Sequence, residues 1–331
     1  MYPTTKKVDT VDTYFGEKVS DPYRWLENDT TKETADWIKS ENEVTLAYLN
    51  KIPYRDQIKK RLEKIYNYER LSAPFKEGEY YYFYKNDGLQ NHSILYRKNG
   101  ENGTPEVFLD PNTFSKDGTT RLAGVSFSKD GSRAAFQISR GGKDWTDAII
   151  INSSDKKVLE DTLRDIKFSG ISWRGNDGFY FSTYDKPKGS QLSAKTQNHK
   201  LFFHKVGTSR SQDKLIFGGE KKPRRYIGGG LTEDERFLIV TAAISTTGNE
   251  MYAMDLKDSK GKLITIVGNF DNNHVLLDND GSRLIIKTNL HAPNERIVAV
   301  DFSKPGVEDV VDTIYEMMRE YDPGKYGPLY D

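Results

Sequence analysis

Residues 166–201, IKFSGISWRGNDGFYFSTYDKPKGSQLSAKTQNHKL, contain the pattern that decides the fold. Two short runs rich in aromatic and β-branched residues, 171–173 and 179–184, flank the polar cluster 174–178. That cluster contains Asn-Asp-Gly, and an Asn or Asp followed by Gly supplies the positive φ that a tight hairpin needs. The stretch therefore predicts two paired strands, and a third apolar run begins at Leu201 after a polar loop.

The same alternation of short apolar runs and turns recurs through residues 73–305. A turn signature, Ser/Asp-x-Asp-Gly-Ser-Arg before an apolar run, occurs at 128–133 and 278–283, and a looser copy occurs at 232–236. Four short strands in about forty to fifty residues are the sequence pattern of a propeller blade. We therefore predict an all-β fold, a β-propeller-like array of about five four-stranded blades.

Both ends of the chain differ from this repeat. Residues 1–72 predict an N-terminal arm, extended at first and then helical, with Pro22 at the first position of a helix that Asp21 caps. Pro53 divides the longer helical pattern that follows into two helices. Residues 306–331 predict a short helix and an irregular tail, and we expect this helix to cover the open edge of the array.

The composition excludes several classes of partner. The 331 residues carry 49 basic and 49 acidic side chains, so no bulk charge attracts nucleic acid or an anionic membrane. No run of eighteen apolar residues exists, and the N-terminus has no apolar core typical of a signal peptide. We expect a cytoplasmic location, or a periplasmic one if a signal peptide was removed. The absence of cysteine excludes disulfides and Cys-based catalysis or metal binding.

No stretch carries a recognisable catalytic group. A nucleophile elbow needs Gly-x-Ser-x-Gly, and the nearest approach, at 170–175, is one residue too long, so we interpret Ser172 as a strand serine. None of the five histidines has a paired metal-ligand spacing, although His199 and His204 lie five residues apart. We therefore predict no catalytic residue, no metal site and no cofactor in this chain.

Several stretches resemble the prolyl oligopeptidase family of serine peptidases. They are DPYRWLE at 21–27, SRGGKDW at 139–145, KFSGISW at 167–173 with HKLFFH at 199–204, and NLHAPN at 289–294. The resemblance extends in unbroken order over about residues 5–305. It implies a two-domain enzyme in which a seven-bladed propeller caps an α/β-hydrolase domain with a Ser, Asp, His triad. The N-terminal arm of such an enzyme packs with the hydrolase domain, and short peptides are cleaved after proline.

The chain departs from the family pattern because it ends after about five blades. Residues 306–331 do not continue the family sequence, and the hydrolase domain with its triad has no counterpart. We therefore expect a non-catalytic propeller portion, inactive alone, whose partners are short proline-containing peptides and the missing α/β-hydrolase domain. The alternative is a stand-alone propeller that binds a protein or peptide without catalysis. A propeller glycosidase with paired carboxylates is a more remote interpretation.

The resemblance implies one substrate contact. The family's propeller offers a Phe from its third-blade KFS stretch to the substrate, and Phe168 matches it. The competing interpretation places Phe168 in the blade core. A second family contact, an Arg from the fourth blade, has no match in the aligned stretch at 240–245.

Overall fold

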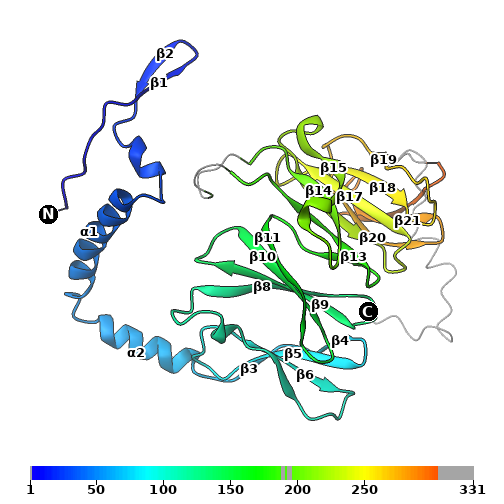
Figure 1. Cartoon of the computed structure of the whole chain (residues 1–331), viewed down its shortest axis with the longest axis horizontal. Coiled ribbons are helices and arrows are strands. Elements are labelled where there is room, and N and C mark those ends of the chain that lie inside the picture. The colour runs from blue at the N-terminus through cyan, green and yellow to red at the C-terminus, as the bar shows by residue number, and fades with distance from the viewer. Residues whose placement is uncertain (1, 188–190, 192–195, 305–331) are drawn as a thin grey trace. The chain divides into compact units, whose positions relative to one another are not determined.

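The computed structural model describes residues 2–187, 191 and 196–304 (Figure 1). The chain divides into two compact units. Unit 1 comprises Met1–Arg121, Ser139–Trp145 and Asp185–Lys195, and unit 2 comprises Leu122–Ile138, Thr146–Tyr184 and Thr196–Asp331. The helix predicted over residues 306–331, and its role as a cap, lie outside the described residues.

Unit 1 begins with a hairpin where the sequence predicts only an extended segment. Strands β1 (Val11–Tyr14) and β2 (Glu17–Ser20) pair antiparallel across Phe15 and Gly16, which both have positive φ. The helix expected at Pro22 is a short 3-10 turn, η1 (Arg24–Glu27), which begins two residues later. The residue at the N-cap of this turn is Tyr23 and not Asp21 as predicted, although the Asp21 carboxylate accepts hydrogen bonds from the Tyr23 amide and the Arg24 Nε atom.

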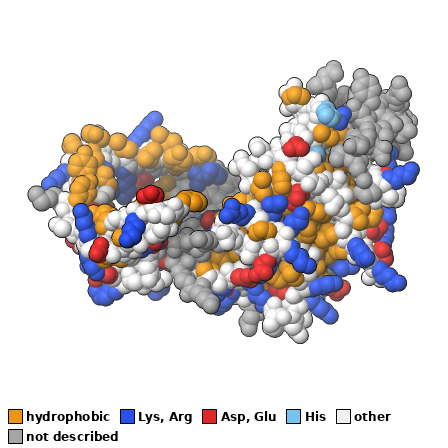
Figure 2. Space-filling view, turned by 90° about the horizontal axis from the view of Figure 1, so that it is seen from above, with side chains coloured by type: hydrophobic (Ala, Val, Ile, Leu, Met, Phe, Trp, Pro, Cys, Tyr) orange, Lys and Arg blue, Asp and Glu red, His pale blue; other side chains and the backbone are white. Residues whose placement is uncertain are grey.

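The two longer helices of unit 1 are α1 (Lys32–Leu49) and α2 (Arg55–Tyr66), as predicted on either side of Pro53. Thr31 caps α1, since its hydroxyl accepts a hydrogen bond from the Thr34 amide at 3.2 Å. The apolar side chains of both helices are largely exposed: Ile38, Leu46, Ile58, Leu62 and Ile65. Figure 2 shows hydrophobic side chains gathered on the side of the view where these helices lie.

The first sheet, also in unit 1, has five strands instead of the four predicted. They are β3 (Arg70–Leu71), β4 (Phe75–Glu77), β5 (Tyr80–Asn86), β6 (Ile94–Asn99) and β7 (Glu106–Leu109), in the order β3-β5-β6-β7 with β4 also paired to β5. The short η2 turn (Pro111–Thr113) follows.

The next three sheets each have four antiparallel strands, which confirms the predicted blade pattern (Figure 1). The second is β8 (Thr120–Phe127), β9 (Arg133–Arg140), β10 (Trp145–Asn152) and β11 (Val158–Lys167). The third is β12 (Ser172–Arg174), β13 (Gly178–Thr183), β14 (Lys200–Lys205) and β15 (Lys214–Gly218). The fourth is β16 (Tyr226–Leu231), β17 (Phe237–Ala243), β18 (Glu250–Asp255) and β19 (Ile264–Val267).

The fifth sheet has three strands within the part of the chain up to residue 304. They are β20 (His274–Asp280), β21 (Arg283–Thr288) and β22 (Arg296–Asp301). Two further 3-10 turns, η3 (Arg210–Gln212) and η4 (Gly219–Lys221), precede and follow β15. Across the described residues, no helix is long and apolar enough to cross a bilayer.

The core of unit 2 lies between successive sheets. Phe179 and Phe181 pack with Ile150 and Ile166 between the second and third sheets. Similar apolar layers join the third sheet to the fourth and the fourth to the fifth: Tyr180, Leu201, Leu238 and Val240 in one, Phe237, Met251, Leu284 and Val298 in the other. Sheets stacked face to face in sequence order are the arrangement that a propeller requires.

Candidate functional site

Phe168 lies directly after β11 and is 44% exposed. The structure therefore places it at the surface and not in the blade core. Its φ is 52°, and Asp165 three residues earlier also has a positive φ of 61°. A bulky residue in the left-handed region is an outlier, and such residues concentrate at functional sites.

The neighbours of Phe168 hold this unusual backbone in place. The Lys167 carbonyl accepts a hydrogen bond from His199 Nε2 at 3.0 Å, and the Ser169 carbonyl accepts one from Gln137 Nε2 at 2.9 Å. The Ser169 hydroxyl accepts a third, from the Ser182 amide at 2.7 Å. Because both flanking residues are fixed, Phe168 retains its outward direction despite the cost of its backbone conformation.

Two tyrosines and a lysine complete an aromatic cluster around Phe168. Its ring centroid lies 6.2 Å from that of Tyr184, nearly edge-on, and 5.9 Å from that of Tyr226. Lys167 Nζ lies 4.9 Å from the centre of the Phe168 ring. Burial, with a smaller effect of Tyr226, raises the pKa of Tyr184 to about 12, so its hydroxyl keeps its proton at neutral pH. The cluster offers aromatic faces and edges to an apolar ring.

His199 supports this cluster as a neutral, fully buried side chain. Its ring stacks on Tyr184 at 4.3 Å, and its Nδ1 atom accepts a hydrogen bond from the Ile227 amide at 2.9 Å. Since Nδ1 accepts, the proton resides on Nε2, which donates to the Lys167 carbonyl. Burial lowers the pKa of His199 to about 4, although the bond to Lys167 opposes this. Both ring nitrogens are thus occupied by protein groups.

The interpretation of Ser172 as a strand serine is confirmed. It lies in β12, and its hydroxyl accepts a hydrogen bond from the Leu231 amide at 3.2 Å. Sequence reasoning missed another feature, the buried pair formed by His204 and Asp213. His204 Nδ1 lies 2.6 Å from Asp213 Oδ1, which is the orienting contact of a catalytic triad. Their side chains are only 0% and 2% exposed, so this pair is part of the interior of the third sheet.

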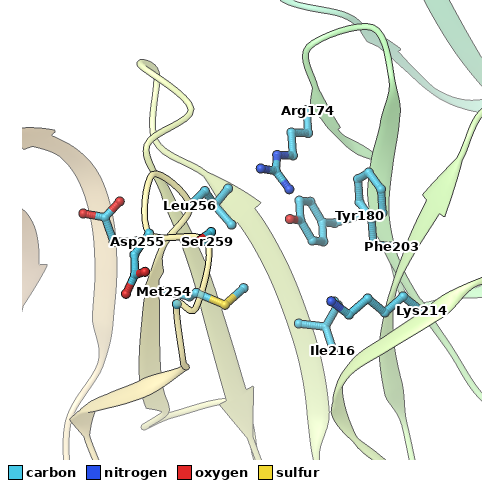
Figure 3. Close-up of a pocket in the computed structure, with 11 residues that line it drawn as sticks. Arg174, Tyr180, Phe203, Lys214, Ile216, Met254, Asp255, Leu256 and Ser259 are labelled. Carbon is cyan, nitrogen blue, oxygen red and sulfur yellow. The ribbon is translucent and has the colours of Figure 1, made fainter.

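A cavity of about 320 Å³ opens between the third and fourth sheets of unit 2. Figure 3 shows Arg174, Tyr180 and Lys214 on one side of it and Asp255 on the other. Asp255 is paired with Arg236 at 3.0 Å. No histidine lines this cavity, so it offers charged and apolar contacts without an imidazole for acid–base chemistry. Among the described residues, no group of His, Asp and Glu side chains is arranged to hold a metal ion.

Comparison with known proteins identifies the fold. The family model of the prolyl oligopeptidase N-terminal beta-propeller domain matches residues 2–321. A prolyl endopeptidase of Elizabethkingia miricola is 53% identical over 329 residues, which are 98% of this chain and 46% of that protein. One of Elizabethkingia meningoseptica is 54% identical over 316 residues, which are 95% of this chain and 44% of that protein. The chain thus spans about half the length of these curated relatives.

Comparison with solved structures supports the same family. Prolyl oligopeptidase B of Galerina marginata, bound to a 35mer hydrolysis and macrocyclization substrate, superposes with a TM-score of 0.78 at 28% identity. The match covers 94% of this chain and 47% of that one. The sheets described above and residues 2–321 of the family match lead to the same conclusion. The chain belongs to the prolyl oligopeptidase family and corresponds to its N-terminal β-propeller domain.

Proposed function

We propose that this chain is the non-catalytic propeller portion of a serine endopeptidase that cleaves short peptides after proline. The observation that carries this proposal is the 53% identity to a prolyl endopeptidase over 98% of the chain. In this proposal the nucleophile, acid and base come from an α/β-hydrolase domain, and the propeller contacts and gates the substrate. The buried His204 and the hydrogen-bonded Ser172 support a chain that does no acyl chemistry itself.

Phe168 is the proposed substrate contact. It is exposed, held in a strained backbone conformation, and bordered by Tyr184 and Tyr226. Proline is apolar and has few conformations to lose, so stacking its ring on an aromatic face gains contact at little entropic cost. The exposed apolar stripe of α2, which includes Ile58, Leu62 and Ile65, supports packing of the arm on the hydrolase domain.

A binding experiment tests the substrate contact. The purified 331-residue chain is titrated with a fluorescent Gly-Pro peptide, and anisotropy reports binding. Phe168→Ala should weaken binding about fivefold to tenfold, as loss of an aromatic contact does. Phe15→Ala is the matched control, since Phe15 is a fully exposed Phe of unit 1. Equal affinities of the Phe168→Ala variant and the wild type would reject the role of Phe168.

A second experiment tests whether the chain alone has peptidase activity. The chain is incubated with a chromogenic Gly-Pro reporter, and release of the leaving group is followed. We expect no hydrolysis above the rate of buffer, and turnover by the chain alone would contradict the proposal. The stand-alone peptide-binding propeller predicts the same two results, so the mass of the natural gene product separates them. The leading proposal expects roughly twice the mass of this chain, as the 46% coverage of the relative implies.

A further inference from the structure

A second cavity of unit 2, of about 530 Å³, lies between the edge strands β16 and β20. Its volume is within the range of small-molecule sites. Residues of β16 and β17 form one wall, and residues 274–276 of β20 form the other. It shares no lining residue with the cavity of Figure 3.

Missing side chains on β16 create this space. Gly228 pairs with Thr241 and Gly230 pairs with Ile239, so both glycines lie on the sheet face that borders the cavity. A Cβ atom on Gly230 would meet no heavy atom within 4 Å, and one on Gly228 would meet only Thr241 Oγ1, at 3.1 Å. Neither glycine has a positive φ that would require glycine. The open space therefore results from the missing side chains at these two positions and not from an unusual backbone conformation.

The lining favours an uncharged ligand. None of the cavity residues is Asp, Glu, Lys or Arg, and Ile239, Ala243 and Leu276 supply apolar walls. Two polar side chains are available for a hydrogen bond. Among the described residues, Thr241 has no bonding partner beyond the backbone pairing of its strand, and its hydroxyl borders the open space. A charged ligand would lose its hydration here without a counter-ion.

His274 is the second polar group. It is 3% exposed, and its Nδ1 atom is buried without a hydrogen-bond partner in the described structure. Asn249 fixes its backbone on both sides, accepting from the His274 amide at 2.8 Å and donating to its carbonyl at 3.1 Å. The strand position of His274 thus does not depend on its ring. A buried nitrogen without a partner is costly. Because the His274 ring lines the cavity, a rotation of that ring that turns the nitrogen towards a ligand would remove this cost.

We propose that this cavity binds an uncharged ring with one hydroxyl or N–H group, the chemistry of a phenol or an indole. The ring occupies the space over Gly228 and Gly230, and its polar group bonds to His274 or Thr241. A neutral imidazole has one N–H and one lone pair, so it can donate to or accept from a hydroxyl. The ligand is either a free small molecule or the side chain of a tyrosine or tryptophan in a peptide.

The position of Tyr226 supports the peptide source. Strand alternation places Tyr226 on the same face of β16 as Gly228 and Gly230, and its ring contacts that of Phe168. A peptide that contacts Phe168 could continue along this face. Binding of a ring by the chain alone does not depend on peptide hydrolysis, so the cavity can be tested separately from the proposed function.

The test measures binding of phenol, indole and N-acetyl-tyrosinamide to the full 331-residue chain by saturation-transfer NMR. We expect saturable binding of phenol with a Kd on the order of 1 mM, as befits seven non-hydrogen atoms. Binding of the blocked tyrosine as well would support a peptide side chain, and binding of phenol or indole alone would support a free molecule. No saturable binding of any of the three would overturn the proposal.

Substitutions of residues that line the cavity test whether the binding occurs there. Gly230→Val fills the open space and should abolish binding, and Gly230→Ala should weaken it if the valine variant does not fold. His274→Phe keeps a ring but removes the nitrogen, so phenol should bind about fivefold more weakly. Thr241→Val removes the hydroxyl and should also weaken phenol binding, whereas Thr265→Val should leave it unchanged, because Thr265 lies on β19 and does not line the cavity. Unchanged phenol binding by a folded Gly230→Val variant would also overturn the proposal.

Discussion

His199 Nδ1 accepts a hydrogen bond from the Ile227 amide at 2.9 Å, and this bond joins the third sheet to the fourth. The same ring donates from Nε2 to the Lys167 carbonyl at the end of β11, which belongs to the second sheet. One buried side chain thus connects three consecutive sheets. It also fixes the residue that precedes Phe168, so the blade interior and the proposed contact are physically linked.

Replacing His199 with Phe should destabilise the chain strongly. The variant keeps a ring beside Tyr184 but removes the acceptor of the Ile227 amide and the Nε2 donor to the Lys167 carbonyl, which are two buried backbone groups. Each such group costs about 1–3 kcal/mol, so we expect a loss of about 3 kcal/mol in the free energy of unfolding. Urea denaturation followed by tryptophan fluorescence measures it. His291→Phe is the control, because His291 is exposed and its replacement should change the midpoint little.

The titration of His199 predicts a loss of stability in mild acid. Burial lowers the pKa of His199 to about 4 in the folded state, against about 6.5 for an unfolded chain. The unfolded chain therefore binds more protons between these values, and the stabilising contribution is complete above pH 6.5 and declines as the pH falls towards 4. Burial lowers the pKa of His274 as well, which adds to the effect.

Melting temperatures between pH 7.5 and 4.5 test this. The wild type should melt at steadily lower temperatures below pH 6.5, and His199→Gln should show a shallower decline although it melts lower at pH 7.5. Carboxylates with lowered pKa values, such as Asp130 and Asp234, titrate mainly below this window. An identical pH dependence in the variant would show that His199 is not the group responsible.

Two turns with the same sequence signature join neighbouring sheets in the same way. Asn176 Nδ2 donates to Asp130 at 2.6 Å, and Asn279 Nδ2 donates to Asp234 at 3.3 Å. Arg133 and Arg236 reinforce these contacts, donating to the carbonyls of Asn176 and Gly281 respectively. Burial favours the protonated form of Asp130, but hydrogen bonds from Asn176, Ser132 and Ser128 outweigh it and hold the pKa of Asp130 well below its usual range.

Asn176→Ala should therefore cost about 1–2 kcal/mol at pH 7, because it removes the bond to the Asp130 carboxylate and a longer one that Asn176 Oδ1 accepts from the Ser132 hydroxyl at 3.2 Å. Asn279→Ala should cost less, because its bond to Asp234 is longer and because alanine removes the Asn279 Oδ1 atom, which is buried without a partner in the described structure; the bond to the Gly281 carbonyl at 3.1 Å is lost as well and offsets part of this difference. The midpoints of urea denaturation for the two variants give the comparison. Equal losses would mean that the shorter contact has no additional strength.

The blade repeat could be predicted from the sequence because it rests on local signals. Turn residues such as Asp130 and Gly131 specify their hairpins within a few positions, and apolar alternation specifies the strands. The hairpin at 11–20 was missed because its strands are largely exposed and lack that alternation. The contacts of His199 could not be predicted, since its partners lie 32 and 28 residues away in other sheets.

The direction of the Phe168 side chain could not be predicted from the sequence either, for a different reason. Alternation along a strand predicts the face of each side chain only while the backbone stays extended. Asp165 and Phe168 both have positive φ, which interrupts the alternation at the end of β11. No rule for non-glycine residues predicts such a position from sequence, so the choice between core and surface required the structure.

The left-handed backbone of Phe168 leads to a prediction that separates a functional role from a structural one. A non-glycine residue pays about 1–2 kcal/mol in this region, and glycine does not. Phe168→Gly should thus be about 1 kcal/mol more stable than Phe168→Ala, after allowing for the greater entropy of glycine in the unfolded chain. Thermal denaturation of both variants measures this difference.

Peptide affinity should follow a different order from stability. Both variants lack the aromatic ring, so both should bind the Gly-Pro peptide equally weakly although the glycine variant is the more stable. If Phe168 acted only by stabilising the fold, affinity would increase with stability and the glycine variant would bind better than the alanine variant. Equal affinities at unequal stabilities would instead mean that the protein tolerates strain at this position in order to present a ring to its ligand.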